Sequence, residues 1–248
     1  ENTYLIFASD NGSSGTGHGC NMPLNGEKNK NFEGGARTSA FIHSPLLSEA
    51  QQGTVYSPAF HATDWLPTIV SGLLGLPLDT ADMRFDGLNL WDSIKSTLDA
   101  DSSGQLHNAA RRVSMPYDFY PLDLFSPKGA VRINDLKLII GDGSGCYYDG
   151  YHENGFDCST ASTMEPLVFN LSSDPYETTN IYQTVPDTDL NALWNEMDKY
   201  WKSQQNAPHV LYELEGETEC LQNLYDSNNG FLKPWIGQCA LTNDDDIH

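Results

Sequence analysis

A short apolar run that ends in two oxygen-bearing side chains and a glycine constrains the fold most strongly. Residues 3–8 read TYLIFA, and Asp10, Asn11 and Gly12 follow closely. Near-continuous apolar runs of this length are typical of buried strands in parallel sheets. Glycine permits the positive φ that some sharp turns require. We therefore predict a buried strand over residues 3–8 and a turn that aims Asp10 and Asn11 at one point.

The Asp10-Asn11 pair has two interpretations. One carboxylate and one amide oxygen are hard ligands, suited to Ca²⁺ or Mg²⁺ and not to zinc. Ligand sites of open α/β sheets lie at the carboxyl ends of strands, where this pair is expected. A plain Asx turn explains the same residues, and the dipeptide alone favours the turn.

A glycine-rich loop follows and carries two of the chain's 13 basic residues. It reads NGEKNKNFEGGAR over residues 25–37 and contains Lys28 and Lys30. A cation beside a metal would offset the charge of an oxyanion. Gly34 and Gly35 permit close backbone approach, and Glu33 or Arg37 would brace the loop. A solvated loop of mixed charge is the alternative.

The order of the remaining elements indicates an α/β chain. We expect a second strand over 38–43, a helix over 64–74 capped by Thr63, and irregular structure over 79–128. A strand pair over 130–140 with a break at Asn134-Asp135, a strand over 166–171 and an amphipathic helix over 187–204 follow. Residues 1–129 are thus predicted to form the later part of a mixed sheet flanked by helices. Residues 130–248 are predicted to form a small α+β subdomain with an antiparallel sheet, one helix and a tail.

The strong negative charge excludes some partners. The formal net charge is −21, from 34 acidic and 13 basic residues. Nucleic-acid binding needs clustered lysine and arginine, so no nucleic-acid partner is expected. No apolar stretch approaches ~20 residues, so no membrane span is expected.

Five cysteines and a sequon point to the secretory pathway. Asn170-Leu171-Ser172 is an acceptor for N-glycosylation, so we predict a glycan at Asn170. Two disulfides and one leftover cysteine are expected. Cys146–Cys158 and Cys20–Cys158 are both open, and Cys220 or Cys239 would reach another segment. An extracellular location is preferred over a lysosomal one.

The motifs together resemble the second half of a type I sulfatase. The chain has strand-Ser-Asp-Asn-Gly, then Pro-Leu-x-Gly-x-Lys, then Glu-Gly-Gly-x-Arg, in that order. It is most similar to the arylsulfatase B, or N-acetylgalactosamine-4-sulfatase, group. The similarity continues through HATDWLPTIVSGLLG, FDGLNLWDSI, AVRINDLKLIIGDGSGCYY and PLVFNLSSDPYETTNI, and reverses both simpler interpretations above. It implies an alkaline-phosphatase-like α/β fold.

The resemblance implies roles at the matching positions. Asp10 and Asn11 would be ligands of one Ca²⁺ ion, and Lys28 would contact the sulfate group of the substrate. Structural support of the site would come from Gly12, Glu33, Gly34, Gly35 and Arg37. Lys30 has no counterpart, and His61 is expected to be structural. Residues 174–180 are expected to form a turn that joins the last strand to the following helix.

The resemblance also implies what the chain lacks. Sulfatases use a formylglycine made within a C/S-x-P-x-R signature, and no segment of this sequence fits that signature. We therefore expect a calcium-dependent sulfuric ester hydrolase, acting on sulfated sugars or aryl sulfates, that is catalytically incomplete as this chain alone. The N-terminal part of the same sulfatase would be its partner. The alternatives are a non-catalytic sulfatase-like matrix or glycan-binding protein, and a zinc-dependent phosphodiesterase or phosphatase of the same superfamily.

Overall fold

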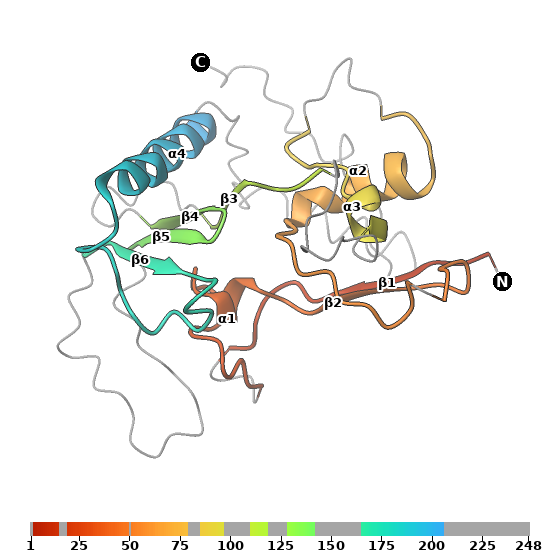
Figure 1. The fold of residues 1–248 in the computed structure, drawn as a ribbon, viewed down its shortest axis with the longest axis horizontal. Helices are drawn as coiled ribbons and strands as arrows, with labels where there is room; N and C mark the ends of the chain where they lie inside the picture. Colours follow the sequence, from red (N-terminus) through yellow and green to blue (C-terminus); the bar gives the residue numbers. More distant parts are fainter. Residues whose placement is uncertain are drawn as a thin grey trace, which may run out of the picture. The chain divides into compact units, whose positions relative to one another are not determined.

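The computed structural model describes residues 2–14, 19–49, 51–78, 85–96, 110–118, 128–141 and 165–205 (Figure 1). The chain divides into two compact units, Glu1–Gln205 and Asn206–His248. All of the described residues belong to the first unit. The predicted boundary between residues 129 and 130 lies within this unit and stays a prediction.

A four-stranded antiparallel sheet is the centre of this unit. It has the order β3 (Ser114–Pro116), β4 (Gly129–Ile133), β5 (Leu136–Ile140) and β6 (Leu167–Asn170). β4 and β5 form the predicted strand pair, and Asn134 turns between them with a φ of 51°. Asparagine tolerates this left-handed conformation better than most residues. The antiparallel sheet is confirmed, whereas β3 lies in a region predicted to be irregular.

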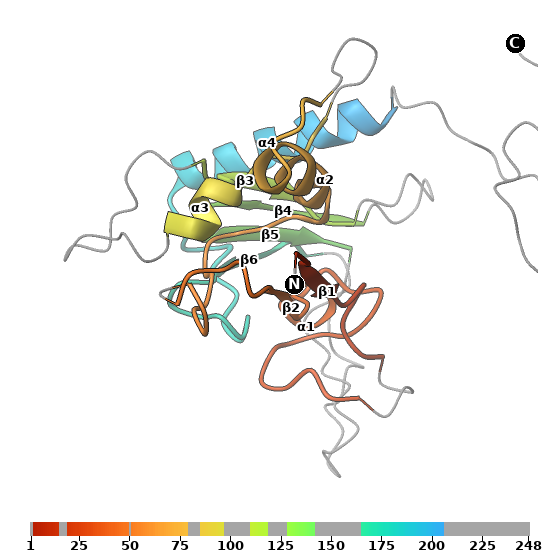
Figure 2. The ribbon, with the colours of Figure 1, turned by 90° about the vertical axis from the view of Figure 1, so that its right-hand side faces the viewer.

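One face of the sheet packs against the long helix α4 (Asp187–Gln205), which confirms the predicted amphipathic helix. Side chains alternate between the faces of a strand, so Val131, Leu138 and Val168 point to the same side. There they form a buried cluster with Leu193 and Met197 of α4. Figures 1 and 2 show α4 along this face.

The opposite face of the sheet is covered by the short helix α1 (Glu33–Ala36) and the residue before it. Phe32, Ala130, Ile139, Leu167 and Phe169 form a second buried cluster on this side. Figure 2 shows α1 on the side of the sheet away from α4. The Glu-Gly-Gly loop of the sequence is therefore packed against the sheet through its own short helix.

The predicted first strand forms, but the prediction that it is buried is wrong for this unit. β1 (Leu5–Ala8) pairs with β2 (Ala40–His43) in antiparallel register, and the two strands form a separate sheet. Leu5, Phe7 and Phe41 are 56%, 50% and 51% exposed. The apolar run specified the strand, but burial depends on neighbours, and β2 is the one paired strand among the described residues.

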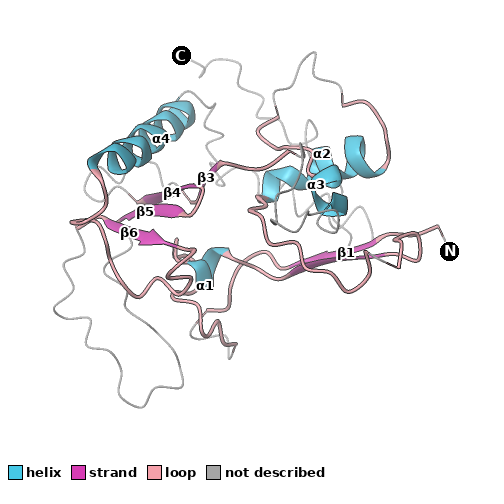
Figure 3. Ribbon diagram, viewed as in Figure 1, coloured by secondary structure: helices cyan, strands magenta, loops and turns pink. Residues whose placement is uncertain are grey.

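The predicted helix over 64–74 is confirmed in place but not in detail. Helical structure begins with a 3₁₀ turn at Ala62–Asp64 (η1), continues through α2 (Trp65–Pro67), and ends as the π-helical η2 (Thr68–Leu73). His61, not Thr63, is the N-cap: its ring accepts from the Thr63 N–H, and Asp64 accepts from the His61 N–H. A neighbouring helix, α3 (Trp91–Lys95), was not predicted (Figure 3).

Asp174 organises the predicted turn between β6 and α4. Its carboxylate accepts from the backbone N–H groups of Thr178 and Thr179. Asn180 accepts from the Val168 N–H, which ties the turn to β6. Among the described residues, no helix is long and apolar enough to cross a membrane.

Leu193→Ala tests the packing between α4 and the sheet. Leu193 is 1% exposed and lies in the buried cluster, so we expect a loss of about 2–5 kcal/mol in unfolding free energy, measured by urea denaturation. Leu74→Ala is the control, because Leu74 is 55% exposed and should cost less than about 1 kcal/mol. Equal losses in the two variants would contradict the described core.

Candidate functional site

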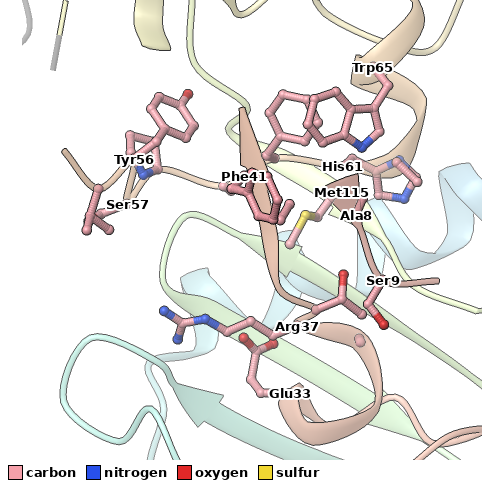
Figure 4. A pocket seen from close by; sticks show the side chains of 18 of the residues that line it. Ala8, Ser9, Glu33, Arg37, Phe41, Tyr56, Ser57, His61, Trp65 and Met115 are labelled. Atoms are coloured by element: carbon pink, nitrogen blue, oxygen red, sulfur yellow. The ribbon is translucent and has the colours of Figure 1, made fainter. Parts of the chain in front are cut away.

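A hollow of about 1570 Å³ lies beside β1, α1 and β2. Ala8, Phe41, His61, Trp65 and Met115 line one part of it, and Arg37 and Glu33 lie in another part (Figure 4). The hollow therefore combines an apolar, aromatic wall with charged groups. Of the predicted site residues, Asp10, Asn11, Lys28, Glu33, Gly35 and Arg37 line it.

Asp10 and Asn11 lie directly after β1, at the edge of the hollow. One oxygen of the Asp10 carboxylate accepts from the Asn11 N–H at 2.8 Å. The Asn11 amide nitrogen donates to the Gly12 carbonyl at 2.8 Å, so this bond does not use the amide oxygen. Asp10 is exposed. The pair therefore presents hard oxygen donors on the side of the hollow.

The loop that carries Lys28 is held against the turn after β1 by backbone hydrogen bonds. The Lys28 N–H donates to the Ser13 carbonyl at 3.2 Å. The Asn21 side-chain oxygen accepts from the Ser13 N–H, and its amide nitrogen donates to the Ser13 carbonyl, both at 2.8 Å. Two segments predicted to share a site are thus neighbours in the fold.

Gly12 is required by the close approach of α1. Its N–H donates to the Gly35 carbonyl at 2.9 Å. A Cβ atom at Gly12 would lie 1.7 Å from the Gly34 carbonyl oxygen, and one at Gly34 would lie 2.5 Å from the Asn25 oxygen. The close backbone approach predicted for Gly34 is therefore confirmed. Gly12 is needed for the same reason and not for a positive φ.

The hollow is lined by both cations and carboxylates, the carboxylates being those of Asp10, Glu33, Asp118 and Asp135. Of the 13 lysines and arginines in this anionic chain, five line it: Lys28, Lys30, Arg37, Lys95 and Arg132. Lys95 pairs with Asp92, and Arg132 pairs with Asp135. No carboxylate within the described ranges forms an ion pair with Lys28, Lys30 or Arg37, and all three are exposed. Their cations are available to an anionic ligand.

Glu33, unlike Arg37, braces the loop through a buried charge network that the sequence reading missed. Glu33 lies 2.9 Å from the ammonium of Lys137, and Glu177 lies 2.8 Å from the same ammonium. Tyr117 donates to Glu33 at 3.1 Å, and its ring lies 4.2 Å from the Lys137 nitrogen. One signal for Lys137 was present in the sequence: it is the one charged residue in the apolar strand LKLII, residues 136–140.

The pKa values of the titratable side chains in this network are shifted from their ordinary values in different directions. Burial would raise the pKa of Glu33, but the charge and hydrogen bond of Lys137 outweigh it, so the pKa is lowered. Burial raises the pKa of Glu177 despite the same lysine. Burial raises the pKa of Tyr117 to about 12. Burial opposes the charge of Lys137, but Tyr117 and both glutamates raise its pKa. Lys137 is therefore charged at neutral pH.

Asp64 forms a second buried ion pair, next to His61, which lines the hollow. Its carboxylate accepts from Arg112, from the Leu88 N–H at 2.7 Å and from the His61 N–H at 2.8 Å. The pKa of His61 is lowered, mainly by burial and then by Arg112. His61 thus lines the hollow and is part of a helix cap, and its lowered pKa favours the neutral imidazole.

Other predicted sites are placed only in part. The Asn170 side-chain oxygen accepts from the Ser172 N–H at 3.1 Å, at the end of β6. Cys20 is exposed and free, and the other four cysteines lie outside the described residues.

Within the described ranges, no group of three or more His, Cys, Asp or Glu side chains is arranged to hold a metal. Asp10 and Asn11 therefore supply part of a ligand set at most.

Comparison with known proteins agrees with the resemblance to sulfatases. No protein-family model matches the chain. The chain is 31% identical over 202 residues to Arylsulfatase J of Mus musculus, a match that covers 75% of this chain and 33% of that protein. The chain thus spans about a third of the length of this relative.

Solved structures share the fold. Ps i-CgsB, solved in complex with k-i-k-neocarrahexaose, aligns at a TM-score of 0.59 and 20% identity, over 92% of this chain and 42% of that chain. The PsFucS1 sulfatase from Pseudoalteromonas sp. aligns at a TM-score of 0.56 and 20% identity, over 84% of this chain and 38% of that chain. The predicted alkaline-phosphatase-like α/β fold class is confirmed.

Acid titration tests the Asp64–Arg112 pair. Burial would raise the pKa of Asp64, but hydrogen bonds from Arg112, Leu88 and His61 lower it below its ordinary value of 3.8. A lowered pKa contributes stability that is present above pH 3.8 and is lost as the pH falls through the folded value. In Asp64→Asn, we expect lower stability at pH 7 and a shallower loss below about pH 4, measured by urea denaturation across pH.

Asp92→Asn is the control for this titration. Asp92 forms an exposed ion pair with Lys95 at 2.8 Å, and its loss should change the unfolding free energy at pH 7 by less than about 1 kcal/mol. An acid slope that is the same with and without Asp64 would contradict the role given to the buried pair.

Proposed function

This chain is a sulfatase homologue, and we propose that it forms part of a calcium-dependent sulfuric ester hydrolase that cleaves sulfate esters of sugars or aryl groups. The observation that carries the proposal is the pairing of two segments. The Asp10-Asn11 turn and the Lys28 loop are joined at Ser13, beside a hollow in which Lys28 has no described ion-pair partner. The sulfate group would lie between a metal and a lysine.

Asp10 and Asn11 fit calcium as part of its ligand set. Calcium takes six to eight oxygen ligands, and this pair offers carboxylate and amide oxygens at an exposed edge of the hollow. Further ligands would come from other parts of the protein. A bound calcium ion would stabilise negative charge on the sulfuryl oxygens.

Lys28 would bind the sulfate group and stabilise the charge that develops on it. Its side chain is exposed at the hollow, while its backbone N–H bonds to the Ser13 carbonyl. A positioned cation in a site that excludes water stabilises a transition state more than the same cation does in water. The nucleophile, a formylglycine in the family that the chain resembles, would be supplied from outside these 248 residues.

The rest of the same protein would cover the exposed sheet of β1 and β2. The rings of Phe7 and Phe41 stack with centroids 5.4 Å apart while each ring remains half exposed. Exposed apolar side chains gathered on one sheet mark an interaction surface. Since the chain covers 33% of Arylsulfatase J, a longer protein offers the residues to bury it.

Substrate and location follow as parts of the same proposal. The aromatic side of the hollow suits a sugar or aryl ring, and the cations suit its sulfate. We place the protein in the secretory pathway, with an extracellular location preferred and a glycan at Asn170. Two disulfide bonds belong to this proposal as well, with Cys20, which is free in the structure, as the leftover cysteine.

Lys28→Ala tests the role of the lysine in the intact protein. We expect kcat/KM for a sulfate ester to fall by about 10²–10³, because one electrostatic contact to the transition state is lost. Lys199→Ala is the control, since Lys199 lies in α4 and pairs with Glu196 at 2.9 Å. Unchanged turnover in Lys28→Ala, at unchanged thermal stability, would rule out the proposed contact.

Metal removal tests the assignment of calcium. Metal analysis of the intact protein should find about one calcium ion per chain, and Asp10→Asn should weaken its binding. Chelation should abolish turnover, and added calcium should restore it. Bound zinc without calcium would favour the phosphodiesterase or phosphatase alternative. Calcium binding without any release of sulfate would favour the non-catalytic alternative.

A further inference from the structure

Lys137 is fully buried between two glutamates, on the face of the sheet that α1 covers. Its side chain is 0% exposed, and its strand neighbours Leu136 and Leu138 point to the α4 side instead. The ammonium contacts Glu33 of α1 at 2.9 Å and Glu177 of the turn after β6 at 2.8 Å. One lysine therefore connects β5, α1 and a turn 40 residues further along the chain.

Glu177 holds the start of α1 directly. Its second carboxylate oxygen accepts from the Glu33 N–H at 2.5 Å, and its carbonyl accepts from the Asn25 side chain at 3.3 Å. Glu177 has a φ of 56°, which is an uncommon conformation for glutamate. The turn maintains this conformation, and the side chain reaches both Lys137 and the helix start. Its position is therefore specified by contacts at both ends.

A short path of backbone hydrogen bonds leads from α1 to the proposed sulfate site. The Gly34 N–H donates to the Asn25 carbonyl at 2.6 Å, within the loop that carries Lys28. The Gly35 carbonyl accepts from the Gly12 N–H at 2.9 Å, next to Asn11. Any shift of α1 against the sheet would thus move both sides of that site.

Stability alone is a poor explanation for this network. A buried ion pair is often no more stabilising than apolar side chains of the same volume, because both charges lose their water. Here two carboxylates share one ammonium, which leaves an excess of negative charge in a buried place. Such a network is better suited to fixing one geometry, since each charge has a required partner.

We propose that Lys137 is a positioning residue: together with Glu33 and Glu177 it locks α1 against β5 and thereby fixes Lys28 relative to Asp10 and Asn11. The lock itself follows from the described contacts. Its consequence for catalysis rests on the proposed function. Lys137 does not touch the hollow, so its effect on a ligand passes through α1 and the glycine contacts.

Hydrogen exchange on the intact protein tests the lock without any need for activity. In Lys137→Met, we expect the amides of Gly12, Lys28 and Gly34 to exchange at least about tenfold faster. The bonds of Gly12 and Gly34 involve α1 directly, and Lys28 bonds to Ser13, the residue next to Gly12. Arg112→Met is the matched control, because it breaks another buried pair and lowers stability elsewhere. Lys199→Met controls for loss of an exposed pair.

The comparison of the two buried variants decides the result. Faster exchange at the three amides in Lys137→Met, beyond that in Arg112→Met, supports the lock. Equal exchange in both variants at matched global stability overturns it. If Lys137→Met fails to fold, Glu177→Gln replaces it: glutamine keeps an acceptor for the Glu33 N–H but loses the charge. Glu177→Gln should then still accelerate exchange in α1, and an unchanged pattern overturns the proposal.

Turnover gives a second readout that separates the two proposals. If the intact protein hydrolyses sulfate esters, Lys137→Met should lower kcat well below the unaltered value at temperatures where the protein is fully folded, and Arg112→Met should not. A kcat that falls equally in both variants would indicate a structural role alone and overturn positioning. If the protein releases no sulfate at all, the proposed function fails while the exchange result still decides the lock.

Discussion

The charge of Lys137, enclosed between Glu33 and Glu177, is the interaction on which the described unit depends most. It is the only described contact in which one side chain joins β5, α1 and the turn before α4. A buried ammonium must have partners, because an unpaired one costs several kcal/mol. The positions of α1 and of the turn at Glu177 are therefore coupled, and each restricts the other.

The four-stranded sheet separates two tasks by the alternation of its side chains. Leu138 and Val168 face α4 and form an apolar cluster that involves no functional residue. Ile139 and Lys137 face α1, where the glycine-rich loop and the turn at Asp10-Asn11 meet. The α4 face thus serves packing alone, whereas the α1 face combines an apolar cluster with support of the candidate site. The hollow lies next to this second side and gathers cations in an otherwise anionic chain.

Much of the fold could be predicted because local pattern specified it. The strand pair around Asn134, the strand before Asn170 and the helix after Asp187 all follow from periodicity and turn chemistry. The burial of β1 was predicted wrongly, because burial depends on neighbouring strands and not on the composition of one strand. The cap of the helix at 62–73 was also misplaced, since His61 and Asp64 form a reciprocal capping pair and the Thr63 hydroxyl bonds to the His61 ring instead.

The sequence by itself determined which residues are candidates for the chemistry: the Asp10-Asn11 pair, Lys28 and the Glu33-Gly34-Gly35 segment, because their types and order are legible without coordinates. Only the tertiary structure decided how they are held. The contact of Lys137 with Glu33 spans 104 positions in the chain and that of Glu177 with Glu33 spans 144. Such pairings arise from packing across a sheet face, and no local pattern specifies them. Glu33 braces its loop through Lys137, whereas Arg37, the other candidate brace of the sequence, is exposed and lines the hollow.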